Sequence, residues 1–170
     1  MMSKMYFQTL NKKIILGIDP GIERLGWGLI KKDGNKFERI DSGVKKTLKT
    51  QKNEERLFLI QSFLEKLIEK EKPEEVSIEK LFFSKNVKTA LNISEVRGVV
   101  LATAQKYGLI IKEFAPLQVK MAICGYGKAD KKDVAKMLAL SVKLPQNKLL
   151  DDETDALAIA LCGALYRSFP

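Results

Sequence analysis

The chain has 170 residues, of which 45% are hydrophobic and 30% are charged, a balance typical of a single soluble globular domain. No apolar run reaches the roughly 20 residues that span a bilayer, and no signal-like block opens the sequence, so we expect a cytoplasmic protein without a membrane partner. A net charge of +9 favours a polyanionic partner, and the absence of histidine excludes His-based catalysis and zinc–histidine sites.

The first half of the chain predicts three strands and a helix. Residues 1–12 show no clear hydrophobic period, and we expect a flexible extension before one domain over residues 13–170. The predicted elements are a strand over 13–19, a turn followed by a second strand within 20–30, and a strand over 36–46. These strands form an antiparallel meander, and an amphipathic helix over 54–72 follows and stops at Pro73.

The second half alternates strands with helices. Its predicted elements are a strand over 74–79, a helix over 86–108, a strand over 109–116, a helix over 128–145 and a helix that begins at Asp151. Strands that alternate with helices imply a parallel part of the sheet, covered on both faces. The fold class is therefore a mixed α/β layer structure.

Two acidic residues stand at predicted strand ends. Asp19 ends the first strand, where Pro20 and Gly21 turn the chain, and Glu79 ends the fourth. Each acid, taken alone, is equally well explained as a turn or surface residue. In a parallel sheet, however, adjacent strand ends bring distant side chains together, so the two converge if these strands are neighbours.

The run DDETD places more carboxylates at the start of the last helix. Acids in a first turn stabilise a helix without further function. The helical wheel nevertheless puts Asp152 and Asp155 on the face that continues through Ile159 and Cys162, and it leaves Asp151 open as an alternative. Oxygen ligands without Cys or His favour Mg²⁺ or Mn²⁺, and a basic protein with such a two-metal site suggests a nuclease.

Four segments, in this order, resemble the RuvC family of Holliday-junction endonucleases. They are IILGIDPGIERLGWGLI, SIEKLFFSKNVKTAL, LQVKMAICGYGKADK and DDETDALAIA, and the resemblance runs from about Ile14 to Ala164. It implies a ribonuclease-H-like fold with a mixed five-stranded sheet flanked by helices. It also implies a homodimer that nicks two strands of like polarity in four-way junction DNA with Mg²⁺, in recombination and repair, beside a branch-migration helicase complex.

Carried over to this sequence, the resemblance makes Asp19, Glu79, Asp152 and Asp155 the catalytic, metal-binding acids. Asp152 is preferred to Asp151 because the family spaces its last two catalytic positions three residues apart. Some relatives have His where this chain has Asp152.

Further residues match family positions that contact DNA. The resemblance makes Phe82 an exposed ring that stacks on an unpaired base, although a core anchor is the alternative interpretation. Lys120 and Lys131 match positions implicated in phosphate contact, and Lys120 lies within an apolar stretch where an ammonium needs an anion. Other candidates for backbone contact are Lys85, Lys88, Lys128 and Lys132, and at Lys128 the relatives commonly have a small residue.

Two other functions fit parts of this pattern. Actin-like sugar kinases and ATPases also begin with a strand, an Asp and a glycine turn, but they need two such domains. A catalytically silent DNA-binding relative is the second alternative, and metal-dependent nicking distinguishes it. The helix over 86–108 is apolar on more than one face, which fits complete burial in the monomer; the resemblance suggests instead that it pairs with its two-fold mate in the dimer.

Overall fold

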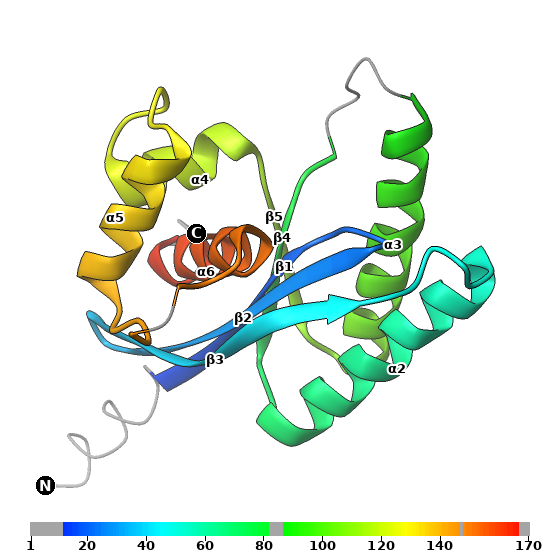
Figure 1. Cartoon of the computed structure of the whole chain (residues 1–170). Coiled ribbons are helices and arrows are strands. Elements are labelled where there is room, and N and C mark those ends of the chain that lie inside the picture. Colours follow the sequence, from blue (N-terminus) through cyan, green and yellow to red (C-terminus); the bar gives the residue numbers. More distant parts are fainter. Residues whose placement is uncertain (1–11, 82–86, 147, 167–170) are drawn as a thin grey trace, which may run out of the picture.

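The computed structural model of the chain describes residues 12–81, 87–146 and 148–166 (Figure 1). The predicted extension over 1–12 lies outside these residues except for Lys12, which begins the first strand. The elements in chain order are β1 (Lys12–Asp19), β2 (Arg24–Asp33), β3 (Lys36–Lys46), α2 (Asn53–Glu71), β4 (Glu75–Glu79), α3 (Val87–Lys106), β5 (Ile110–Phe114), α4 (Pro116–Cys124), α5 (Lys131–Ser141) and α6 (Asp151–Leu165). No helix in the described ranges is long and apolar enough to cross a membrane.

The five strands form one mixed sheet in the order β3-β2-β1-β4-β5. The strands β1, β2 and β3 are antiparallel neighbours, whereas β4 is parallel to β1 and β5 is parallel to β4. This arrangement confirms the predicted fold class. It also places β1 at the centre, so that the end of β1 lies beside the end of β4.

The sheet separates two apolar cores. Figure 1 shows α2 and α3 on one side of the sheet and α4, α5 and α6 on the other. Successive side chains of β1 point to opposite faces of the sheet and pack into different cores. Ile15 packs with residues of α6, and Leu16 and Ile18 pack with residues of α2 and α3. All three are at most 1% exposed, so β1 is held from both faces.

Glycines on β1 and β2 let α6 lie directly against the sheet. A Cβ atom at Gly17 would stand 2.1 Å from the carbonyl oxygen of Ala156, and one at Gly26 would stand 2.0 Å from that of Asp152. Both distances are far below van der Waals contact, so only glycine fits this approach. The first turn of α6 is thereby fixed against the strand that follows Asp19.

The helix α4 was not predicted from the sequence. It has nine residues, and its N-cap Ala115 has no polar side chain, so the usual start signal is missing. Instead the Ala115 backbone N–H donates to Gln118 Oε1 at 2.8 Å, and Gly125 ends the helix with φ of 78°. The α5 helix is shorter than predicted, because Asp130 caps its start and it ends at Ser141, before Pro145.

Candidate active site

Asp19 and Glu79 stand side by side where β1 and β4 end. The parallel pairing aligns Ile18 with Ile78, so the following residue on each strand lies at the same edge of the sheet. The predicted convergence of these two acids is therefore confirmed. Both side chains are half-buried.

Arg97 fixes the end of β4 from the side of α3. Its side chain is 10% exposed; it donates to the backbone carbonyl oxygen of Glu79 and forms an ion pair with Glu113. The backbone N–H of Lys80 also donates to the carbonyl oxygen of Phe114 at 2.8 Å, which ties the same edge to β5. The backbone from which the Glu79 side chain extends is therefore fixed.

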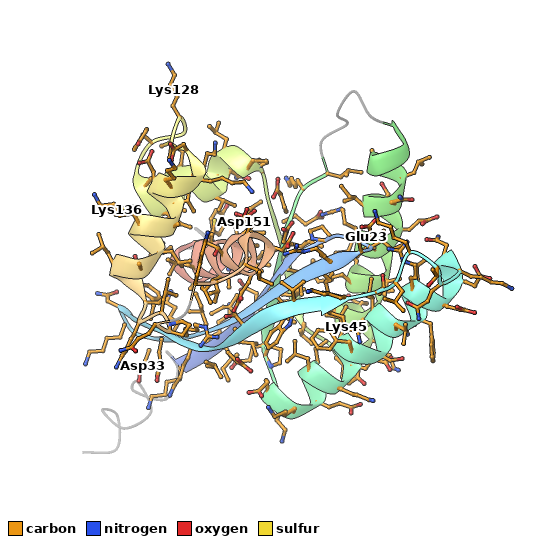
Figure 2. The ribbon with its side chains drawn as sticks, viewed as in Figure 1. Glu23, Asp33, Lys45, Lys128, Lys136 and Asp151 are labelled. Atoms are coloured by element: carbon orange, nitrogen blue, oxygen red, sulfur yellow. The ribbon has the colours of Figure 1, made fainter. Side chains whose placement is uncertain are left out.

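The start of α6 supplies the other two predicted acids. Asp152 and Asp155 are half-buried, and Ile159 and Cys162 on the same face are at most 2% exposed. This is the orientation that the helical wheel predicted. Asp151 is exposed, and Figure 2 labels it on α6.

Burial and the neighbouring acids raise the pKa of Asp19 and of Glu79. The pKa of Asp19 is raised from 3.8 to about 7, first by burial and then by the charges of Asp155, Glu79 and Asp152. The pKa of Glu79 is also raised, by burial and by the charge of Asp155. Lys131 opposes both shifts but does not cancel them. The cluster therefore lacks positive charge.

Two cations already contact the α6 acids. Lys131 Nζ donates to Asp155 Oδ2 at 2.9 Å, and this bond raises the pKa of Lys131. Arg24 Nη2 lies 2.5 Å from Asp152 Oδ2. Arg24 was missed in the sequence analysis. It stands five positions after Asp19, at the start of the next strand, and because β2 runs antiparallel to β1 the start of β2 lies at the same edge of the sheet as the end of β1.

The donor set fits a hard divalent cation. Four carboxylates from β1, β4 and α6 act on one another electrostatically, and their oxygens are the ligands that Mg²⁺ prefers. Among the described residues, no three acids or cysteines are gathered closely enough to hold an ion together. Two of the acids instead point to Arg24 and Lys131. Because the α6 backbone is fixed against Gly26, gathering the acids requires side-chain rotation.

A cavity of about 310 Å³ adjoins the acids between α4, α5 and α6. Lys120 and Lys131 line it together with Glu79 and Asp155, and its remaining wall is mostly apolar. The structure thus brings Lys120, which is half-buried on α4, to the same site as the acids.

Of the other predicted DNA contacts that the structure describes, Lys128 and Lys132 do not line this cavity. Phe82 and Lys85 lie outside the described residues, as does the side chain of Lys88. Lys128 is exposed in the loop after α4, and Figure 2 shows its side chain extending outward from the molecule. Lys132 is exposed on the first turn of α5.

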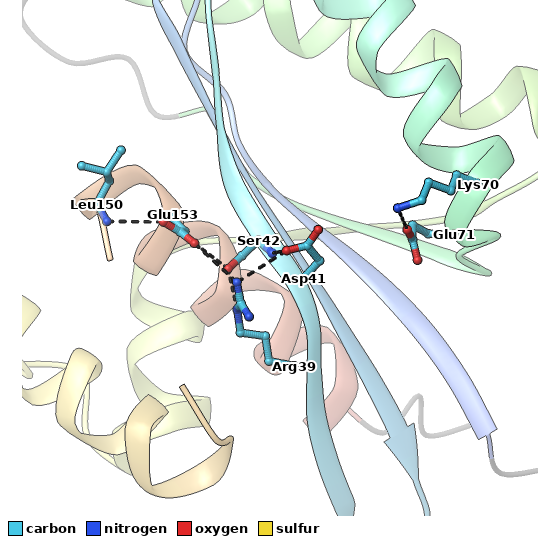
Figure 3. A network of polar contacts seen from close by, with 7 residues as sticks. All are labelled: Arg39, Asp41, Ser42, Lys70, Glu71, Leu150 and Glu153. Atoms are coloured by element: carbon cyan, nitrogen blue, oxygen red, sulfur yellow. Dashed lines mark hydrogen bonds and ion pairs between the residues drawn. The ribbon is translucent and has the colours of Figure 1, made fainter. Parts of the chain in front are cut away.

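Glu153 is the third acid of DDETD, and it holds α6 in place instead of facing the other acids. It is 8% exposed and accepts a hydrogen bond from Ser42 Oγ at 2.6 Å, with Arg39 of β3 at 3.8 Å (Figure 3). Its other oxygen accepts from the backbone N–H of Leu150 at 3.4 Å. A Glu at the third position of a helix is a known capping signal, so the sequence contained the cue.

Comparison with known proteins gives consistent matches over most of the chain. The family model of the crossover junction endodeoxyribonuclease RuvC matches residues 15–163. The protein of that description from Ruminiclostridium cellulolyticum is 46% identical over 149 residues, which cover 88% of this chain and 90% of the relative. That from Petrotoga mobilis is also 46% identical, over 157 residues, with coverages of 92% and 96%.

Solved structures agree with the fold. The structure of Thermus thermophilus RuvC in complex with a Holliday junction substrate has a TM-score of 0.85 at 33% identity, covering 91% of this chain and 94% of that one. The yeast mitochondrial Holliday junction resolvase Ydc2 has a TM-score of 0.62 at 14% identity, covering 89% of this chain and 76% of that one. The second likeness concerns the fold alone.

Proposed function

The chain belongs to the RuvC family of crossover junction endodeoxyribonucleases, and from this we propose that it resolves Holliday junctions by metal-dependent, symmetric nicking of two strands of like polarity. The observation that carries the proposal is the cluster of Asp19, Glu79, Asp152 and Asp155, in which burial and then the charges of the other three acids raise the pKa of Asp19 to about 7. An enzyme that keeps such a costly cluster at the edge of its sheet has a use for a cation there.

In this proposal the four acids hold divalent metal ions. Their oxygen-only chemistry fits Mg²⁺, with Mn²⁺ as a substitute. When bound, such ions supply the Lewis acidity that favours attack of water on a phosphodiester and departure of the leaving oxygen. Asp152 is preferred to Asp151 as a ligand because its charge acts on Asp19, whereas Asp151 is exposed and acts on Lys131.

The basic residues at the site would position the DNA. Lys131 is held at the edge of the cluster by Asp155, and Lys120 lines the adjoining cavity, so both ammonium groups are placed to contact phosphates near the cut. Lys85 and Lys128 would contact the DNA backbone, and Phe82 would stack on an unpaired base at the crossover. The net charge of +9 supports this partner.

Symmetric cutting requires two active sites, so we include a homodimer in the proposal. A two-fold axis places two copies of a site on strands of like polarity in a four-way junction. Exposed apolar surface on α3, where Leu91 is 60% exposed, is the candidate interface. A branch-migration helicase complex is the further partner, and the cytoplasm the expected location.

Asp19→Asn tests the proposal directly. The substitution removes a metal ligand but leaves the positive surface intact, so cleavage of a four-way junction should disappear while junction affinity stays within about twofold. Loss of affinity together with cleavage would count against the assigned role. Asp33→Asn makes the same change of charge at the far end of the sheet and should retain cleavage. A wild-type protein that binds the junction but never cuts it would favour the silent DNA-binding relative.

A further inference from the structure

Arg24 occupies an unusual position beside the acids. It is the first residue of β2, and its backbone is paired with Lys46 of β3. Its guanidinium lies 2.5 Å from Asp152, where the Arg24 side chain is 45% exposed and that of Asp152 is 28% exposed. The ion pair therefore stands at the rim of the cluster, between the acids and solvent.

The contact of Arg24 is with one acid of the four. Lys131 offsets only part of the rise in the pKa of Asp19, and Lys131 and Arg97 offset only part of the rise in that of Glu79. Arg24 therefore pairs with Asp152, and the carboxylate of Asp19 still lacks enough positive charge beside it. A divalent ion placed among the acids repels a guanidinium at this distance, so the ion and Arg24 compete for Asp152.

The side chains of Arg24 and Asp152 can separate without movement of the backbone. The backbone of Asp152 is fixed against Gly26, and that of Arg24 by the β2–β3 ladder. The Arg24 side chain already borders an open depression of about 540 Å³, which Lys131, Lys148, Asp151 and Asp152 also line. With Asp152 turned to a metal ion, three cations and one remaining carboxylate would border this depression, a balance that suits a phosphate, which a guanidinium binds in bidentate fashion.

We propose that Arg24 exchanges Asp152 for a DNA phosphate when a divalent metal ion binds, so that metal and DNA promote each other's binding. The inference rests on the proposed function and assigns Arg24 as a positioning residue of the same site. Coupling of this kind is reciprocal: metal frees Arg24 for the phosphate, and a phosphate that takes Arg24 frees Asp152 for the metal.

The first test measures metal binding without DNA. Calorimetric titration with Ca²⁺, an oxygen-binding ion, should give an affinity at least about fivefold tighter for Arg24→Gln than for the wild type, because the competitor is gone. Lys12→Gln removes the same charge at the opposite end of β1 and should leave the affinity unchanged. Equal affinity of wild type and Arg24→Gln, or binding to neither, would overturn the inference.

The second test measures the salt dependence of junction binding, in EDTA and in Ca²⁺, with a gel confirming that the DNA stays intact. In Ca²⁺, Arg24→Gln should reduce the slope of log affinity against log salt by about 0.9 per subunit, the value for one phosphate contact, and in EDTA it should not. Arg24→Lys, which keeps the charge, should retain most of the slope. A loss that is equal in EDTA and Ca²⁺, or absent from both, contradicts the exchange.

These outcomes are separable from failure of the proposed function. If the wild type does not bind the junction, or if Asp19→Asn binds Ca²⁺ as the wild type does, the metal-dependent nuclease assignment fails. If the wild type binds both ligands and Arg24→Gln matches it in every titration, only the role of Arg24 is refuted.

Discussion

Replacing Asp19 by Asn should stabilise the metal-free protein while it abolishes catalysis. Asp19 has a pKa of about 7 in the folded chain, compared with 3.8 for the unperturbed group, because burial and three neighbouring acids disfavour its charge. Since the folded pKa is the higher one, the favourable contribution of Asp19 is complete below pH 3.8 and is lost as the pH rises through 7. Asparagine has no charge to bury at any pH.

The size of the effect follows from the shift. A difference of about three pKa units, at about 1.4 kcal/mol each, gives Asp19→Asn an advantage of at most about 4 kcal/mol at pH 8. At pH 5 Asp19 is protonated in the folded wild type but still ionised in the unfolded wild type, and only this difference favours unfolding. The advantage of Asp19→Asn over the wild type therefore falls to about 2 kcal/mol. The gain in stability should therefore grow between pH 5 and pH 8.

Urea unfolding followed by circular dichroism, in EDTA at both pH values, measures this difference. Asp33→Asn is the matched control, because it removes a charge at the other end of the sheet, and it should show no comparable pH dependence. Adding Mg²⁺ should stabilise the wild type and shrink the advantage of Asp19→Asn. A variant that is less stable than the wild type at pH 8, or a gain that is the same at both pH values, would refute the reasoning.

Three further predictions concern two residues that hold α6 in place and the ring proposed to stack on DNA. Gly26→Ala places a Cβ 2.0 Å from the carbonyl oxygen of Asp152, so it should lower the free energy of unfolding by about 1–3 kcal/mol and impair cleavage. Gly98→Ala is the control, because open space surrounds Gly98, and it should be tolerated in the monomer. Thermal melts of the two variants make the comparison. Glu153→Gln weakens the anchor to β3 and should cost about 1–3 kcal/mol in urea unfolding, and an unchanged midpoint would contradict that role. Phe82→Ala should lower the cleavage rate more than junction affinity, and if gel shift and cleavage assays both match the wild type, Phe82 is not the stacking ring.

Much of the fold was predictable because it depends on local patterns. The alternation of β1 and the amphipathic spacing of α2 are visible in the sequence, and the strand ends at Asp19 and Glu79 follow from a turn signal and from strand length. The α4 helix was missed because its N-cap residue, Ala115, has no polar side chain and its apolar period is too short to reveal it. Short helices of this kind are specified by what they pack against.

The arrangement around the acids was harder to predict for a similar reason. The sequence places Asp152 and Asp155 on one helical face, but their cations, Arg24 and Lys131, come from distant elements whose approach only the folded chain defines. The separation of Glu153 from the other acids also depends on Ser42, which lies 111 positions away. Long-range pairs of this kind leave little trace in a single sequence.

The measurement that tests the central claim most directly is cleavage of an end-labelled, mobile four-way DNA junction by the purified protein, with Mg²⁺ or with EDTA, beside linear duplex and single-strand controls. The account predicts paired nicks at symmetric positions on strands of like polarity, on the junction only and with metal only. Tight junction binding without any cut in Mg²⁺ or Mn²⁺, or equal cutting of the linear controls, would contradict it.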